Sequence, residues 1–301
     1  MTRRAVGLIF VLVTAACGSG CASMARVIAE APLTWSMQSE ADDRLDAMAS
    51  APRPVTRPIV ILAGLYDPGI GSNLLATRLE RVLAADAPIL ALSFVGAPTF
   101  DACRDRVIAE VNEAWPSDDP NATIEVDVVA ISMGGLVARY AARPAYDEPR
   151  LRVRRLFTIC TPHLGAQLAG FPTIDQRIID MRPGSALLSF LNGMPAADDP
   201  AIVAYARPGD LLVGDRYATP PSGEIHWFTP GPFEDAHINA AADPRILEDI
   251  ARRLRVESRP HASSKDSATA HAAPAEWRES STSPRILCHS VHDARTSSPD
   301  S

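Results

Sequence analysis

The sequence predicts an α/β fold: a mostly parallel sheet of about six strands with helices on both faces. Three observations predict it. Apolar runs of strand length alternate with segments whose apolar residues recur at helical spacing. Several runs, such as PIVILAGL, are apolar throughout, which is typical of strands buried on both faces. The 301 residues include 47% hydrophobic and 22% charged residues, which is enough for a substantial core.

The first predicted strand is PIVILAGL, residues 58–65, which ends at the turn Asp67-Pro68-Gly69 and leads into a helix over 73–84. PILALSF (88–94) is the second strand, and the helix over 101–115 follows it. TIEVDVVAI (123–131) is the third strand. The remaining elements are a helix over 133–142, strands over 151–160, 201–207 and 224–229, and a last helix over 244–254 behind Asp243, a predicted N-cap.

Composition divides the chain into four parts. Residues 1–21 are predicted to be a signal peptide, and 22–56 a polar, partly helical spacer. Residues 57–256 hold the α/β domain, with an insertion at about 165–200. Residues 257–301 are rich in Ser, Ala, Pro and His without periodicity, so we expect a disordered tail.

The N-terminus predicts export. Thr2-Arg3-Arg4 precedes the apolar run AVGLIFVLVTAA, which is of signal-peptide length and too short to span a bilayer comfortably. Cys17 and Cys21 follow directly, and the stretch resembles a bacterial lipoprotein signal, in which a cysteine is lipidated. The resemblance implies a membrane-anchored protein of the cell envelope that faces the periplasm. Plain secretion and an uncleaved anchor remain alternatives.

Charge and cysteine spacing argue against two other kinds of site. The net charge of −7 gives no electrostatic reason to expect a nucleic-acid partner. Outside the signal region, Cys103, Cys160 and Cys288 show no CxxC spacing, so no metal site is predicted. Cys103 and Cys160 are open to two interpretations, a disulfide or two buried free thiols.

The stretch VDVVAISMGGLVARY carries the chemistry. An apolar strand stops at Ser132 and continues as a helix, with small residues at Ala130, Gly134 and Gly135 that let the strand and helix pass closely. The stretch resembles the nucleophile elbow of the α/β-hydrolase superfamily, in its lipase and esterase branch, which includes enzymes that deacylate glycosylphosphatidylinositol lipids. Ala130 stands where that family usually has Gly. The alternative is an ordinary βα turn with an incidental serine.

The resemblance implies a triad in the chain order serine, acid, histidine. His237, in a loop between the last strand and the last helix, matches the position of the family's catalytic histidine. His163, in TPHLG, precedes every candidate acid and is expected to be structural or to line the pocket. His226 lies within a predicted strand and is expected to pack there.

The acid is expected in ARPGDLLVGD. Asp210 follows a strand and a Pro-Gly turn, and its DLLV resembles the D-x-x-V of related lipases. Asp215 is the second candidate. Asp235 is interpreted as a loop or capping residue.

Two backbone N–H groups are expected to stabilise an oxyanion. One is the N–H of Met133, directly after the elbow. By alignment with lipases the other is the N–H of Leu65, although the usual His before Gly64 is Ala63 here. Tyr66 has two interpretations, a residue that helps this site stabilise the oxyanion and a residue that only lines the pocket.

The insertion contains RPGSALLSFLNGM, whose apolar residues cluster in a short helical segment. Two interpretations remain, a lid over an acyl pocket and ordinary core packing. The residues assigned to the pocket or lid are Leu187, Leu188, Phe190 and Leu191.

These features together predict an exported serine hydrolase that cleaves carboxylic esters of acyl or lipid substrates, without a metal or organic cofactor. An acyltransferase or thioesterase with the same triad is one alternative. A non-catalytic cell-envelope lipoprotein on the hydrolase fold is another.

Overall fold

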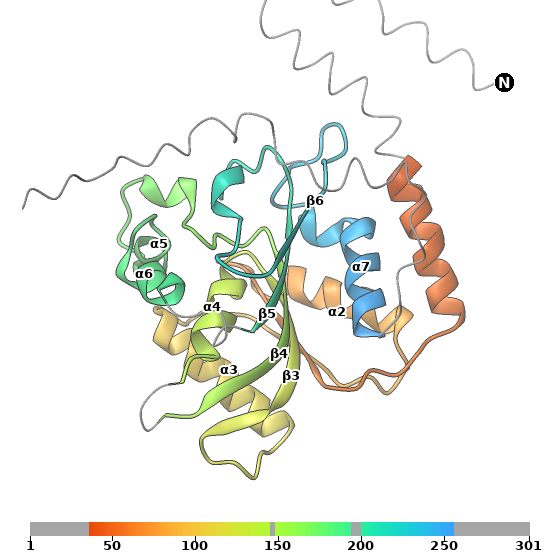
Figure 1. Cartoon of the computed structure of the whole chain (residues 1–301), viewed down its shortest axis with the longest axis horizontal. Helices are drawn as coiled ribbons and strands as arrows, with labels where there is room; N and C mark the ends of the chain where they lie inside the picture. Colours follow the sequence, from red (N-terminus) through yellow and green to blue (C-terminus); the bar gives the residue numbers. More distant parts are fainter. Residues whose placement is uncertain (1–35, 145–147, 194–199, 256–301) are drawn as a thin grey trace, which may run out of the picture.

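The computed structural model describes residues 36–144, 148–193 and 200–255. They form a six-stranded sheet covered by helices on both faces (Figure 1), as the sequence predicts. The strand order is β2-β1-β3-β4-β5-β6, and all five neighbouring pairs are parallel. The predicted signal peptide, the cysteines Cys17 and Cys21, and the predicted tail lie outside the described residues.

Each predicted strand and long helix is present, with ends that differ by a few residues. The strands are β1 (Ile59–Leu62), β2 (Ile89–Leu92), β3 (Ala122–Ile131), β4 (Arg150–Ile159), β5 (Ala201–Ala206) and β6 (Glu224–Trp227). The helices are α2 (Ile70–Val82), α3 (Phe100–Ala114), α4 (Met133–Ala141), α5 (Gln176–Asp180), α6 (Ala186–Asn192) and α7 (Pro244–Leu254). Asp243 caps α7, because its side chain accepts the N–H of Arg245.

The strand order reverses beside β1. β1 pairs with β2 on one side and with β3 on the other, so the chain winds outward in both directions from this point. In open parallel sheets the crevice outside the carboxyl ends of the strands at such a reversal is the usual ligand site. The fold therefore directs attention to the loops that follow β1 and β3.

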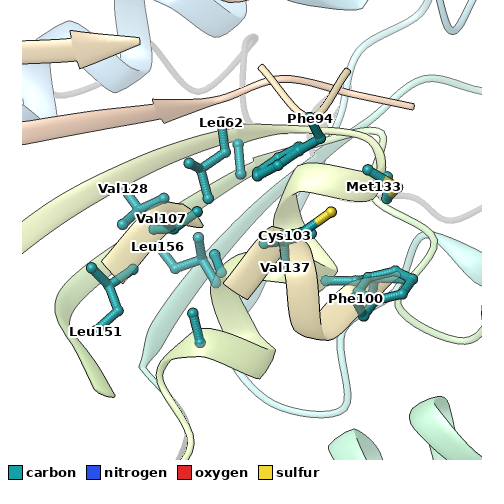
Figure 2. Packing of buried hydrophobic residues seen from close by; sticks show 14 of the residues in the cluster. Leu62, Phe94, Phe100, Cys103, Val107, Val128, Met133, Val137, Leu151 and Leu156 are labelled. Carbon is teal, nitrogen blue, oxygen red and sulfur yellow. The ribbon is translucent and has the colours of Figure 1, made fainter. Parts of the chain in front are cut away.

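Two apolar cores fill the layers. One lies between the sheet and α3, α4 and α6, and Figure 2 shows Cys103 and Val107 of α3 gathered with Val128 and Leu156 of the sheet. The other core lies on the opposite face, under α2 and α7. Each fully buried aliphatic side chain contributes about 1.5–3 kcal/mol, so these layers stabilise the scaffold on which the loops rest.

Residues 36–50 form a helix, as expected of a partly helical segment, but this helix packs on the domain (Figure 1) and is not a spacer. Leu45 and Met48 are buried in the core under α2 and α7. Arg44 forms an ion pair with Glu248 of α7 at 3.0 Å. The folded unit therefore begins before residue 57.

Cys103 and Cys160 are free, buried thiols. They lie in the two different cores, on opposite faces of the sheet, which excludes a bond between them. Within the described ranges, every helix is too short or too polar to cross a membrane.

Candidate active site

Ser132 lies at the abrupt turn between β3 and α4, with φ 51° and ψ −120°. A non-glycine residue in this conformation costs about 1–3 kcal/mol and persists only where its surroundings hold it. Two hydrogen bonds do so. The Ser132 N–H donates to the carbonyl of Ile159 at 2.8 Å, and the Thr161 hydroxyl donates to the carbonyl of Ser132 at 2.8 Å.

The two glycines after Ser132 are required by close packing. A Cβ on Gly134 would lie 2.7 Å from the carbonyl oxygens of Leu62 and Ala63, at the end of β1. A Cβ on Gly135 would lie 2.2 Å from the Thr161 hydroxyl oxygen. The start of α4 thus sits directly against β1 and the loop after β4, which only glycine permits.

His237 links Ser132 to Asp210. The His237 Nε2 atom lies 3.0 Å from the Ser132 hydroxyl oxygen, and its Nδ1 atom lies 2.8 Å from Asp210 Oδ2. The other carboxylate oxygen of Asp210 accepts the N–H groups of Leu212 and Val213, both at 2.9 Å. The structure therefore brings together the serine, acid and histidine selected from the sequence.

The acid is held in its charged form. Burial raises the pKa of Asp210, but the hydrogen bond from His237, the charge on that ring and the N–H groups of Val213 and Leu212 outweigh it. The pKa of Asp210 therefore lies below its ordinary value. A buried carboxylate facing Nδ1 can fix the ring so that Nε2 faces the serine.

The other histidines lie elsewhere. His163 is fully buried, with Nε2 3.0 Å from the Thr158 hydroxyl, and burial together with Arg139 holds its pKa well below the ordinary value. His226 is buried in β6 and stacks on Tyr205. Both are packing residues.

The other acids serve as caps in loops. Asp215 accepts the N–H of Gly209 at 2.9 Å. Asp235 accepts the N–H groups of His237 and Ile238. Asp235 thus shapes the loop that carries His237.

The two expected oxyanion donors lie at the ends of β3 and β1. Met133 is the first residue of α4, where a helix leaves its N–H groups without intrahelical partners, and its side chain is anchored in the core (Figure 2). Leu65 follows Gly64, at which a Cβ would lie 3.4 Å from the Ser132 Cβ. The loop after β1 therefore runs directly beside the serine.

The residues assigned to a pocket or lid lie in α6, and the structure places this helix against the core instead. Leu188 and Leu191 are buried in the core with α3 and α4, and Leu187 packs against it. Phe190 contacts Tyr140 in an edge-to-face arrangement, at the C-terminal end of α4, whereas Ser132 precedes the N-terminal end of that helix. Core packing, the second interpretation of this segment, is the one that the structure supports.

A group of exposed apolar side chains lies in the segments after the strands, and sequence reasoning found only Tyr66 among them. The group consists of Tyr66 after β1, Val95 after β2, Leu164, Leu168, Phe171 and Ile174 after β4, Leu211 after β5, and Phe233 and Ile238 after β6. Loops have no periodicity, so no pattern in the sequence distinguishes these residues. They lie in the segments that follow the carboxyl ends of the strands, and Ser132 lies at this edge of the sheet.

Backbone strain is concentrated at the same edge. Among the described non-glycine residues, positive φ occurs at Tyr66, Ser132, Cys160 and Phe233, all in segments that follow a strand. Strained residues of this kind cluster at functional sites. The strain and the apolar loops thus point to the same part of the molecule.

Cys160, Asp210 and His237 place possible metal-ligand atoms within 4.8 Å of one another, and they are the one such group in the described part of the chain. Asp210 Oδ2 and His237 Nδ1 are already bonded to each other. The closeness of Asp210 and His237 in this group is therefore explained by the hydrogen bond between them.

Comparisons with known proteins agree with this geometry. Residues 96–174 match the family described as "Putative serine esterase (DUF676)", a segment that contains Ser132 and ends before Asp210 and His237. The all-parallel six-stranded sheet with helices on both faces is the α/β architecture that the sequence predicts. The match supports a hydrolase of the esterase or lipase type, as the elbow predicts. No curated protein sequence gave a significant match.

Solved structures of low sequence identity resemble the chain. The mature form of a Bacillus licheniformis lipase is 15% identical, with a TM-score of 0.49 over 68% of this chain and 94% of its own. A Listeria innocua gene product is 13% identical, with a TM-score of 0.46 over 68% of this chain and 96% of its own. A Legionella pneumophila phospholipase is 12% identical, with a TM-score of 0.47 over 68% of this chain and 59% of its own.

Proposed function

We propose that this protein is a serine hydrolase that cleaves carboxylic esters of acyl or lipid substrates through an acyl-enzyme on Ser132. The observation that carries the proposal is the continuous line of contacts from Ser132 Oγ through His237 to Asp210, at 3.0 Å and 2.8 Å. These are the distances that general-base activation of a serine needs.

In the first half of the reaction, His237 Nε2 takes the hydroxyl proton while Ser132 Oγ bonds to the carbonyl carbon of the ester. The carbonyl oxygen becomes an oxyanion that accepts hydrogen bonds from the N–H groups of Met133 and Leu65. His237 then returns the proton to the alcohol oxygen, the C–O bond to the alcohol breaks, and the acyl group stays on Ser132. Asp210 stabilises the imidazolium ring throughout.

In the second half, water replaces the alcohol. His237 removes a proton from the water as its oxygen attacks the acyl carbon, and the proton returns to Ser132 Oγ as the acid departs. The enzyme is regenerated, and neither step needs a cofactor.

The exposed apolar loops favour acyl or lipid esters over small polar ones. Ile174 and Phe233 are almost entirely exposed. Side chains of this size on loops that surround a candidate active site suit an acyl chain or a lipid surface.

A fluorophosphonate probe tests the proposal. Labelling should occur in the wild-type protein and be lost in Ser132→Ala. Ser189→Ala is the matched control, because Ser189 is exposed on α6, whose Phe190 contacts the C-terminal end of α4 and not the end that follows Ser132. Absence of labelling in the folded wild-type protein would favour the non-catalytic scaffold. Turnover of a short-chain ester, a thioester and a phospholipid would then identify the leaving group and separate hydrolysis from transfer.

We also propose export and lipidation at Cys17 or Cys21, from the sequence resemblance to a lipoprotein signal. The test is metabolic labelling with a fatty-acid analogue in a bacterial host. Loss of label in Cys17→Ser or in Cys21→Ser would identify the modified residue, and equal label in both single variants and in the double variant would contradict the proposal.

A further inference from the structure

The loop after β1 lacks the side chain that braces it in the lipases that this chain resembles, since Ala63 stands at the position of their His. Part of the loop is nevertheless well fixed. The Asp67 carboxylate accepts the N–H groups of Gly69, Gly71 and Ser72, and the Ser93 hydroxyl donates to the Asp67 carbonyl at 2.7 Å. These bonds hold the end of the loop that leads into α2.

The end beside Ser132 has a different attachment. Tyr66 has φ 59°, a strained value for a tyrosine, and its side chain is 61% exposed, so core burial does not fix it. Its hydroxyl donates to Asp175 Oδ2 at 2.7 Å, and the Arg177 guanidinium lies over its ring, 5.3 Å from the centroid. Asp175 lies 109 residues after Tyr66 in the chain, and both Asp175 and Arg177 belong to the insertion.

Asp175 and Arg177 form a rigid partner for the tyrosine. Arg177 donates to both carboxylate oxygens, with Nε 3.1 Å from Oδ1 and Nη2 2.7 Å from Oδ2. The hydrogen bond from Arg177, which outweighs the effect of burial, and the bond from Tyr66 lower the pKa of Asp175 to about 2. The carboxylate is therefore charged at any working pH and always able to accept the tyrosine hydroxyl.

We propose that Tyr66, Asp175 and Arg177 form a brace that positions the oxyanion loop, so that the N–H of Leu65 faces the reacting carbonyl oxygen. All three are positioning residues, and the inference rests on the proposed function of Ser132. Leu65 and Tyr66 are the two central residues of one turn, closed by the bond from the Asp67 N–H to the Gly64 carbonyl at 3.4 Å. Movement of Tyr66 therefore changes the direction of the Leu65 peptide.

The brace also assigns a role to the insertion. α6 packs in the core. α5 begins directly after Asp175, which accepts the hydrogen bond from Tyr66 in the loop beside Ser132. The insertion thus contributes to the site by holding a loop in place, although α6 is not a lid.

Tyr66→Phe tests the brace, because it removes one hydroxyl and keeps the ring under Arg177. We expect kcat for a short-chain ester to fall about tenfold with KM within about twofold, since a displaced donor weakens the transition state more than the bound substrate. The inhibition constant of an alkyl boronic acid, which binds through the oxyanion donors, should rise in proportion. Tyr140→Phe is the matched control, because the Tyr140 hydroxyl donates to Asp101 at 2.5 Å between α4 and α3, outside the site.

Asp175→Asn and the double variant Tyr66→Phe/Asp175→Asn complete the test. If the two residues act through one bond, kcat of the double variant should be no lower than kcat of the less active single variant. Hydrogen exchange at residues 64–67 should also be faster in Tyr66→Phe than in wild type, a measurement that needs no activity.

The failures are distinguishable. A wild type that turns over ester while Tyr66→Phe matches Tyr140→Phe in kcat, boronic-acid affinity and exchange would overturn the brace alone. A folded wild type without turnover or labelling would overturn the proposed function, and the catalytic role of the brace with it.

Discussion

Gly134→Ala is the sharpest test of why the elbow needs a glycine two residues after the serine. The added Cβ would lie 2.7 Å from two backbone carbonyl oxygens at the end of β1, those of Leu62 and Ala63. Neither oxygen belongs to a flexible side chain, so α4 and β1 must move apart. Ordinary contact begins at 3.4 Å, which requires a separation of about 0.7 Å.

The consequence differs for stability and for activity. Overpacking of this kind costs about 1–3 kcal/mol, and the better helix propensity of alanine returns up to about 1 kcal/mol. The net loss of unfolding free energy should therefore be about 0–3 kcal/mol. The same shift separates Ser132 from the loop that carries Leu65, and a misplacement near 1 Å can cost about 100-fold in rate. We expect kcat to fall about 10- to 100-fold.

The assay is ester turnover well below the melting temperature, together with urea unfolding of the same samples. Gly170→Ala is the control, because no atom lies within 4 Å of an added Cβ there and its φ is not positive. That variant should keep both its rate and its stability. A folded Gly134→Ala protein whose kcat stays within twofold of wild type would refute the close-packing explanation of the elbow.

Three further predictions follow from the site and the core. Asp210→Asn should lower kcat about 10⁴-fold, whereas Asp215→Asn should change it less than about threefold; equal residual rates would contradict the assignment of the acid. The pKa of Asp210 is lower in the folded protein than in the unfolded chain, so its contribution to stability is present above about pH 4 and is lost as the pH falls through the folded pKa. When the free energy of unfolding is measured in urea at a series of pH values, Asp210→Asn should therefore lose less stability at acid pH than wild type does. Leu191→Ala should destabilise the protein by about 2–5 kcal/mol in urea unfolding, while Phe190→Ala should leave the preference for acyl-chain length unchanged; a shift in that preference would restore the lid interpretation.

The sequence predicts the sheet and its helices well because β1, β5 and the carboxyl halves of β3 and β4 are largely buried and therefore form nearly continuous apolar runs. It also selects Ser132, Asp210 and His237, since the order of a strand-to-helix serine, an acid and a loop histidine is visible along one chain. It does not decide the role of α6, because the pattern of apolar residues in a helix is the same whether its leucines face a core or a pocket. The sequence predicts some helix between residues 22 and 56 but not its packing on the domain. Leu45 and Met48 lie three residues apart, a helical spacing that does not show whether another surface covers them. The contact between Tyr66 and Asp175 joins residues 109 positions apart, which no local motif can reveal.

The two expected oxyanion donors are held by different physical means, and this difference predicts where the site can change. The N–H of Met133 is fixed by the hydrogen bonds of the Ser132 N–H to the Ile159 carbonyl and of the Thr161 hydroxyl to the Ser132 carbonyl. The packing of Gly134 against β1 and the buried Met133 side chain add to this. Releasing it requires the loss of several contacts at once, because bonds of about 1 kcal/mol each and close packing act together. The N–H of Leu65 depends on a short turn whose outer residue is exposed and attached by side chains. Substitutions that alter turnover without unfolding the protein should therefore be found on the β1 loop and at its partners in the insertion, rather than at the elbow.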